Sequence, residues 1–191
     1  MHERTDDELV QLFARGDNQA FEELVLRYKN SLYQYLKTLV KDEGTAGDLF
    51  QEVFIALFKH AADFRAEGKV KSWLFLTARN KAFNYLRDHT KNRDSLDQTD
   101  EEGNEFLHET LPDGTPPVLE QLTSREGAEH ICQAVEQLPP HQREAIYLRQ
   151  YFSFKEIADL LERPLGTVLA DFHRAVQKIR TQLERQEGEL I

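Results

Sequence analysis

Residues 153–180 constrain the fold most, because they combine two helical patterns around a single break. Ser153 and Glu156 match a capping box, in which a serine hydroxyl and a glutamate carboxylate satisfy backbone N–H groups at a helix start. A short apolar face follows at helical spacing, and Pro164 then disfavours helical backbone for the preceding residue. A second, longer amphipathic pattern begins at once. Two helices around a tight turn are typical of a helix-turn-helix, the unit that places one helix in a DNA major groove.

The second predicted helix has a clear apolar face and an unusual polar one. Its exposed face is expected to begin with Leu169, Ala170 and Asp171, whereas a base-reading helix normally offers Arg, Lys, Asn or Gln there. The candidate DNA-binding residues of the motif are Lys155, Thr167, Leu169, Ala170, Asp171, His173, Arg174 and Lys178. Of these, the basic residues near the end of the set are suited to holding the DNA backbone.

The first ninety residues predict four further amphipathic helices. A capping box at Thr5 to Glu8 opens the first, Asp17 is expected to cap the second, and Thr45 the third. The fourth runs from about Val70 to His89. Apolar residues recur at three- and four-residue spacing, which favours one compact bundle. No strand-forming alternation occurs, so the predicted fold class is all-α.

The acidity of the chain is concentrated in one segment. The net charge is −10, but residues 5–92 carry 13 basic and 13 acidic side chains. Residues 93–122 carry one arginine and nine acids, with few apolar residues to bury. The sequence therefore predicts a four-helix domain over 1–92, an acidic flexible linker over 93–122 and a helix-turn-helix domain over 123–191.

Several classes of protein are disfavoured. No apolar run approaches the ~20 residues that span a bilayer, and the polar, acidic start does not look like a secretory signal, so we expect a cytoplasmic protein without membrane insertion. Cys132 is alone, which excludes an internal disulfide, and its apolar helical setting predicts burial. The histidines are scattered, and neither a glycine-rich phosphate loop nor a nucleophile elbow occurs. We expect no catalytic residue, metal or cofactor, and no enzyme activity.

Several motifs, in order along nearly the whole chain, resemble one family. The segment from Ala46 to Phe54 and the pair Trp73-Leu74 resemble the first conserved domain of bacterial sigma-70-type factors, in the extracytoplasmic-function group. Leu138-Pro139-Pro140 and Gly166-Thr167-Val168 resemble the promoter-distal domain of the same family. The resemblance implies a sigma factor that directs transcription initiation by core RNA polymerase, with a linker between two domains.

The resemblance also implies two contact surfaces in the first domain. The clamp helices of the largest polymerase subunit are expected to bind Asp48, Phe50, Gln51 and Glu52, and the second domain is expected to bind the flap. Opened promoter DNA near minus ten needs cations for phosphates and flat groups for unpaired bases. The residues expected there are Arg65, Lys69, Lys71, Trp73, Arg79, Asn80, Lys81, Asn84 and Arg87, with Phe75, Phe83 and Tyr85 interleaved. For Trp73 and Tyr85, the alternative of a core position is favoured.

The acidic linker gains a role from the same resemblance. The family threads this segment through the active-site cleft and RNA exit path of the polymerase, which normally hold nucleic acid. Nine acids can occupy such basic surfaces by mimicking a phosphate backbone. The alternative is a plain solvated tether.

Departures from the family pattern generate further hypotheses. Leu169, Ala170 and Asp171 predict weak base reading at minus thirty-five, with recruitment by a DNA-addressing partner protein or an unusual promoter. Gly47 stands where an acid is common, and phosphorylation of Thr45 would restore a negative charge there. An anti-sigma factor is a further expected partner. The alternative function is a sigma-like regulator or adaptor that recruits polymerase through another DNA-binding protein.

Overall fold

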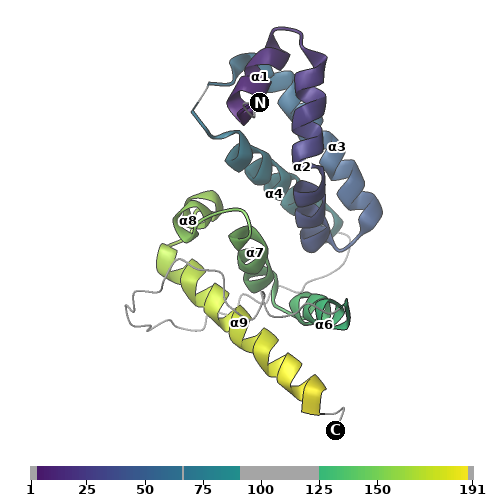
Figure 1. Ribbon diagram of the computed structural model, residues 1–191, viewed down its shortest axis with the longest axis vertical. Coiled ribbons are helices and arrows are strands. Elements are labelled where there is room, and N and C mark those ends of the chain that lie inside the picture. The colour runs from purple at the N-terminus through teal and green to yellow at the C-terminus, as the bar shows by residue number, and fades with distance from the viewer. Residues whose placement is uncertain (1–3, 66, 91–124, 189–191) are drawn as a thin grey trace. The chain divides into compact units, whose positions relative to one another are not determined.

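The structure is a computed structural model that describes residues 4–65, 67–90 and 125–188, without the side chains of residues 90, 125–130 and 186–188. The chain divides into two compact units, residues 1–97 and 98–191. Helices dominate both, and the described residues include no strand (Figure 1). The all-α prediction is confirmed. The acidic linker predicted over 93–122 lies outside the described residues, and the domain boundaries at 92 and 123 stay predictions.

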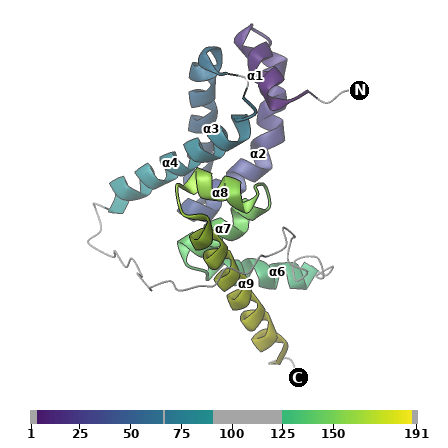
Figure 2. The ribbon, with the colours of Figure 1, turned by 90° about the vertical axis from the view of Figure 1, so that its left-hand side faces the viewer.

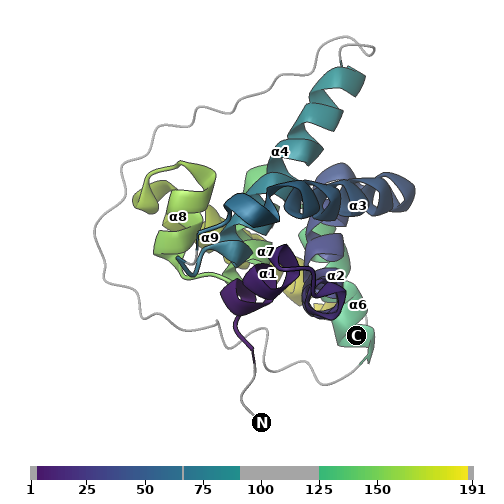
Figure 3. The same cartoon turned by 90° about the horizontal axis from the view of Figure 1, so that it is seen from above.

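The first unit is built around its second helix. Helix α2 packs against α1, α3 and α4, and a single 3-10 turn follows α3. Figures 2 and 3 both show the C-terminal end of α4 projecting from the other helices of this unit. The bounds are Asp6–Ala14 for α1, Asn18–Val40 for α2, Glu43–His60 for α3, Ala61–Asp63 for the 3-10 turn and Val70–Thr90 for α4.

Two of the three predicted helix caps in this unit are confirmed. Thr5 forms a capping box with Glu8, and the Asp17 carboxylate accepts from the first backbone N–H groups of α2. The prediction that Thr45 caps α3 is wrong. Asp42 is the cap, and its Oδ2 accepts from the Thr45 backbone N–H at 2.7 Å. Aspartate caps at least as well as threonine, so the helix starts earlier and tolerates a glycine in its first turn.

The core of the first unit consists of large apolar side chains from all four helices. Leu9, Leu24, Leu57 and Leu74 are almost entirely buried. Burying each such side chain contributes roughly 1.5–3 kcal/mol relative to leaving it exposed. This core holds α3 and α4 in fixed register, so the outward faces of the two helices are positioned together.

The second unit is built around its last helix, as the sequence predicted for a helix-turn-helix. Helix α9 packs against α6, α7 and α8. The Ser153 capping box is confirmed, because Ser153 N–H donates to Glu156 Oε2 at 2.8 Å. Glu162 ends α8 with a left-handed φ of 53°. The bounds are Arg125–Glu136 for α6, Pro140–Arg149 for α7, Phe154–Leu161 for α8 and Leu165–Gly188 for α9.

The prediction that Cys132 is buried is wrong, because its side chain is exposed. The buried stripe of α6 passes through Ala134 and continues to Leu138 beyond the helix end. Cys132 precedes Ala134 by two residues, which turns it about 200° away at 3.6 residues per turn. Burial was predicted because cysteine is an apolar residue type, although its position in the helix is opposite the buried stripe.

Candidate nucleic-acid interface

One face of α3 carries polar side chains that are open to solvent. Asp48, Gln51 and Glu52 are exposed, and their three- and four-residue spacing places them on one face of the helix. Phe50, predicted to act with them, is half-buried, and its ring centroid lies 4.9 Å from that of Phe54. The structure brings three of the four predicted residues together and places Phe50 in the aromatic packing of the unit.

Two large apolar side chains of α3 are exposed without having been predicted so. Ile55 exposes 52% of its surface and follows Gln51 by one helical turn. Phe58 has 61% of its surface exposed. One side of its ring still packs against Phe13, with 5.2 Å between the centroids. The exposure of Ile55 could have been predicted from the sequence, because Ile55 lies four residues after Gln51 and therefore on the same face of the helix.

Cations lie at the start of α4 and in the segment before it. Arg65 and Lys69 are exposed, whereas Lys71 is half-buried. The Lys69 amine lies 2.7 Å from Glu67 Oε2, and this hydrogen bond raises the pKa of Lys69 and lowers the pKa of Glu67. The predicted cations are therefore on the surface, with one of them partly neutralised by an acid that sequence reasoning passed over.

A residue of α1 holds the same segment in place. Asp7 Oδ2 accepts a hydrogen bond from the Gly68 backbone N–H at 2.6 Å. Gly68 has a φ of 67°, a left-handed conformation that glycine adopts without steric cost. The contact joins residues far apart in the chain, and no sequence pattern indicated it.

The middle of α4 combines flat, cationic and amide side chains. Asn80 and Asn84 are exposed one turn apart, as predicted. The Arg79 guanidinium lies over the Phe83 ring, 4.6 Å from its centroid, and 43% of Phe83 is exposed. A cation stacked on a ring beside two amides is suited to binding phosphates and unpaired bases.

Two further predicted cations of α4 have acidic neighbours. Lys81 Nζ lies 2.8 Å from Glu52 Oε2 on α3, and 27% of the lysine side chain is exposed. Arg87 is exposed, and its Nε lies 3.6 Å from Asp88 Oδ1. Lys81 is thus less open to DNA than its place in the sequence predicted.

The aromatic residues of α4 differ widely in exposure. Phe75 is fully buried against Tyr35, with 5.3 Å between ring centroids, so its expected role as a stacking surface is wrong. Trp73 is half-buried, and its ring centroid lies 5.8 Å from that of Phe64. Tyr85 is half-buried as well, and its hydroxyl lies 3.2 Å from Thr45 Oγ1. Trp73 and Tyr85 therefore lie at the rim of the core rather than within it.

In the helix-turn-helix, most predicted contact residues reach the surface. Exposed side chains are those of Lys155, His173 and Lys178, and half-buried ones are those of Thr167, Leu169, Ala170 and Arg174. The start of α9 therefore presents mostly small and apolar groups to solvent, with its cations further along the helix.

Asp171 is the exception, and the prediction that it lies on the exposed face is wrong. Only 3% of its side chain is exposed. Asp171 follows Val168 by three residues and precedes Ala175 by four, and both of those are fully buried. This spacing places Asp171 on the buried stripe of α9, a signal that periodicity alone could have supplied.

Two arginines and a histidine surround the buried carboxylate. Arg163 Nη2 lies 2.8 Å from Asp171 Oδ2, in the turn before α9. His141 Nε2 of α7 lies 3.6 Å from Oδ1, and Arg174 Nη1 lies 3.7 Å from the same atom. We call Asp171, Arg163, Arg174 and His141 the Asp171 cluster.

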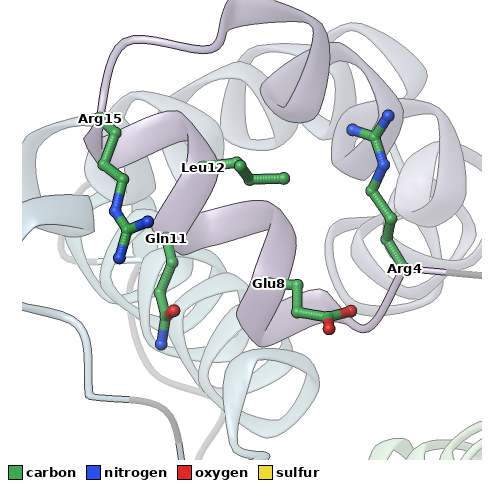
Figure 4. Close-up of a pocket in the computed structure, with 5 residues that line it drawn as sticks. All are labelled: Arg4, Glu8, Gln11, Leu12 and Arg15. Carbon is green, nitrogen blue, oxygen red and sulfur yellow. The ribbon is translucent and has the colours of Figure 1, made fainter.

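An open hollow of about 390 Å³ lies along α1 and the segment before it. Figure 4 shows its lining, with the Arg4 and Arg15 side chains at opposite ends and Glu8, Gln11 and Leu12 between them. Glu8, Gln11 and Leu12 come from α1, and Arg4 and Arg15 lie just before and just after it. The lining is mixed in charge and brings together no acid–base pair of an active site.

The described ranges contain neither a metal site of clustered ligands nor a membrane-spanning helix. Between residues 4 and 188, apart from the undescribed gaps, no three His, Cys, Asp or Glu side chains are grouped to hold a metal ion. Within the same ranges, no helix has the length and apolar character needed to cross a bilayer.

Comparison with known protein families matches both units. Residues 24–92 match the model described as Sigma-70 region 2, and residues 128–179 match the model described as Sigma-70, region 4. The first match contains α3 and α4, and the second contains the helix-turn-helix.

Relatives cover nearly the whole chain. The RNA polymerase sigma-H factor of Pseudomonas aeruginosa is 31% identical over 182 residues, covering 94% of each chain. The ECF RNA polymerase sigma-E factor of Haemophilus influenzae is 32% identical over 185 residues, covering 94% of this chain and 96% of that one. The fold resembles that of the sigma factor RpoE from Bartonella quintana, solved in complex with the anti-sigma factor NepR. Its TM-score is 0.64 at 21% identity, covering 87% of this chain and 98% of that one.

Proposed function

The chain belongs to the sigma-70 family of RNA polymerase sigma factors, in the extracytoplasmic-function group, and we propose that it binds core RNA polymerase and directs transcription initiation. Members of this family are initiation factors rather than enzymes. The observation that carries the proposal is the adjacency of two outward faces. The polar face of α3 and the Asn80–Asn84 face of α4 belong to packed helices, linked at the surface by Glu52 and Lys81.

Transcription from purified components tests this function. Core polymerase with this chain alone is expected to start transcripts from a fragment library of the native genome, whereas core enzyme alone is not. Transcripts that require a third protein would instead support the alternative of a sigma-like adaptor. Absence of transcripts with every added fraction would contradict both functions.

We propose that Asp48, Gln51 and Glu52 contact the polymerase clamp helices. All three side chains are exposed on one face, and Ile55 adds an apolar group one turn away. Gln51→Ala should weaken core binding several-fold, because an exposed interface side chain is lost without disturbing the core. Glu22→Ala, at an exposed position of α2, is the matched control. Equal affinities for the two variants would contradict the assignment.

We propose that α4 binds and opens promoter DNA near minus ten. Arg79 stacked on Phe83 supplies a cation and a flat ring, and Asn80 and Asn84 supply amide groups for a base edge. Asn84→Ala should reduce permanganate reactivity of thymines in the opened region. Asn30→Ala, an exposed asparagine of α2, should leave it unchanged.

We propose that the acidic segment 93–122 occupies the nucleic-acid path of the polymerase, with a solvated tether as the alternative. Its nine acids are the support for this role. Replacing them by the corresponding amides keeps length and shape while removing charge. A changed ratio of abortive to full-length transcripts is expected, and an unchanged ratio would favour the tether.

We propose that the second unit reads little sequence at minus thirty-five. Because Asp171 is buried, the outward groups at the start of α9 are Thr167, Leu169, Ala170 and His173. None of them is a residue that commonly makes bidentate contacts to a base. Base-specific protection at minus thirty-five that disappears with His173→Ala would contradict this proposal.

Partners and location are part of the same proposal. They comprise core polymerase, promoter DNA, and an anti-sigma factor or DNA-addressing protein, acting in the cytoplasm. Purification of the native complex identifies them together. Recovery of this chain with polymerase subunits alone would contradict the proposal of an anti-sigma factor or DNA-addressing protein.

Phosphorylation of Thr45 stays a prediction. Its hydroxyl is partly buried against Tyr85, so a phosphate would have to displace that contact. Normal polymerase binding by Thr45→Ala, with native protein as the reference, would argue against the modification.

A further inference from the structure

The Asp171 carboxylate is the centre of a charged cluster inside the helix-turn-helix. It lies on α9, and its three basic neighbours come from α7, from the turn before α9 and from α9 itself. A buried charge is costly unless partners compensate it. Here Arg163 makes the close contact, at 2.8 Å, and the other two lie within 3.7 Å.

The two arginines and the histidine of the cluster remain partly open to solvent. The exposed side-chain fractions are 29% for Arg163, 38% for Arg174 and 43% for His141, against 3% for Asp171. The cluster therefore shows positive charge outward and hides its negative charge.

The position of the cluster is the one at which a phosphate would meet this motif. Arg163 precedes the first residue of α9 by two positions, and the N-terminus of a helix attracts anions through its backbone N–H groups. Pro164, directly before α9, and Leu165 and Gly166, its first two residues, are all exposed.

We propose that Asp171 is a positioning residue that holds Arg163 and Arg174, with His141 beside them, as one surface for the phosphate groups of duplex DNA. The inference rests on the proposed function and deepens it. Phosphate contacts fix the placement of a protein on DNA without carrying sequence information. The second unit would then hold promoter DNA through its backbone although the start of α9 lacks base-reading side chains.

A purely structural role for the cluster predicts the opposite change in DNA affinity for one variant, Asp171→Asn. If Asp171 only neutralises its neighbours, Asp171→Asn removes a negative charge near the phosphates and should tighten DNA binding. If Asp171 positions the arginines, the same variant loosens them and weakens binding. Asparagine has nearly the shape of aspartate, so packing changes little.

The test uses polymerase reconstituted from core enzyme and the full chain. Equilibrium binding to a labelled promoter duplex is measured from about 50 to about 200 mM salt. Arg163→Gln and Arg174→Gln are each expected to lower the slope of log affinity against log salt by about one. Asp171→Asn is expected to lower affinity several-fold and to add little in the Arg163→Gln background.

Arg185→Gln is the matched control. It removes one exposed cation from α9, about 21 Å along the helix from Asp171, and should leave the slope unchanged. Thermal melting confirms that each variant is folded. If Asp171→Asn does not fold, the two arginine variants still test whether the cluster contacts phosphates, and unchanged slopes for both would overturn the proposal.

Two outcomes overturn the proposal: tighter binding by Asp171→Asn, or unchanged slopes for both arginine variants. Run-off transcription by the same wild-type preparation tests the proposed function separately. Transcripts with unchanged slopes would reject only the phosphate surface. Absence of transcripts would reject the initiation function whatever the slopes.

Discussion

Glu52 of α3 and Lys81 of α4 form an ion pair, with 2.8 Å between Oε2 and Nζ. The acid belongs to the proposed polymerase contact and the lysine to the proposed DNA contact. Glu52 therefore restrains a side chain of the proposed DNA surface, and Lys81 restrains a side chain of the proposed polymerase surface. The pair makes the two faces parts of one surface, although each lies on its own helix.

Disrupting this pair should affect function far more than stability. Glu52→Gln and Lys81→Gln are expected to change the free energy of unfolding by less than about 1 kcal/mol, because exposed pairs contribute little. Glu52→Gln should weaken core binding, and Lys81→Gln should reduce promoter opening. Urea unfolding, core-binding titration and permanganate footprinting measure the three quantities.

The pair of Lys37 and Glu43 provides the matched control for that experiment. It has 2.6 Å between Nζ and Oε1 and is also partly exposed. Lys37→Gln should have an equally small effect on stability and none on transcription. A loss of transcription as large as that of Lys81→Gln would show that any surface charge of this unit matters.

Asp171 should matter for stability in a way that an ordinary surface acid does not. Asp171→Ala is expected to lower the free energy of unfolding by more than about 1 kcal/mol, because it removes a buried carboxylate that is paired with Arg163. Asp159→Ala, at an exposed position of α8, should stay within about 0.5 kcal/mol of wild type. Chemical denaturation of the full chain, followed by the helical signal, checks both values. Equal effects would contradict the buried placement of Asp171.

Two phenylalanines of α4 should separate folding from DNA opening. Phe75 is fully buried, so Phe75→Ala should cost about 3–5 kcal/mol of stability. Phe83 exposes 43% of its surface under Arg79, so Phe83→Ala should cost much less and should reduce promoter opening. Thermal melting and permanganate reactivity distinguish the two. Equal destabilisation would contradict the different environments of the two rings.

The cap of α3 should make stability depend on acid pH. The Thr45 backbone N–H donates to Asp42 and lowers the pKa of that carboxyl below its ordinary 3.8. A lowered pKa in the folded state means that this stabilisation is present above pH 3.8 and is lost as pH falls through the folded value.

Asp42→Asn isolates this effect, because asparagine caps a helix about as well as aspartate. The difference in unfolding free energy between wild type and Asp42→Asn should shift against wild type below about pH 4. Asp42→Ala should be less stable than both at neutral pH. A pH-independent difference between wild type and Asp42→Asn would contradict the capping geometry.

Local signals were sufficient for much of the fold. The capping boxes at Thr5 and Ser153 were predicted because all their partners lie within three residues. The break at Pro164 was predicted for the same reason. The start of α3 was wrong, because Asp42 and Thr45 are both good caps and local preference does not choose between them.

The residue types of the candidate site could be predicted from the sequence, but the exposure of individual side chains was predicted less well. Asn80 and Asn84 were assigned correctly to the surface, since polar spacing at one turn defines a face. Phe75 and Cys132 were misplaced, because an apolar residue beside a core stripe can lie on either side of its boundary. That boundary depends on which helices pack around it.

The sequence by itself determined the helical class of this protein, the helix-turn-helix and the residue types on α3 and α4, because periodicity and capping act over a few residues. Only the tertiary structure decided which charges meet. Glu52 reaches Lys81, Asp7 holds Gly68, and Asp171 turns inward to Arg163. Such pairs form between elements whose distance is set by core packing, and no local pattern encodes that distance.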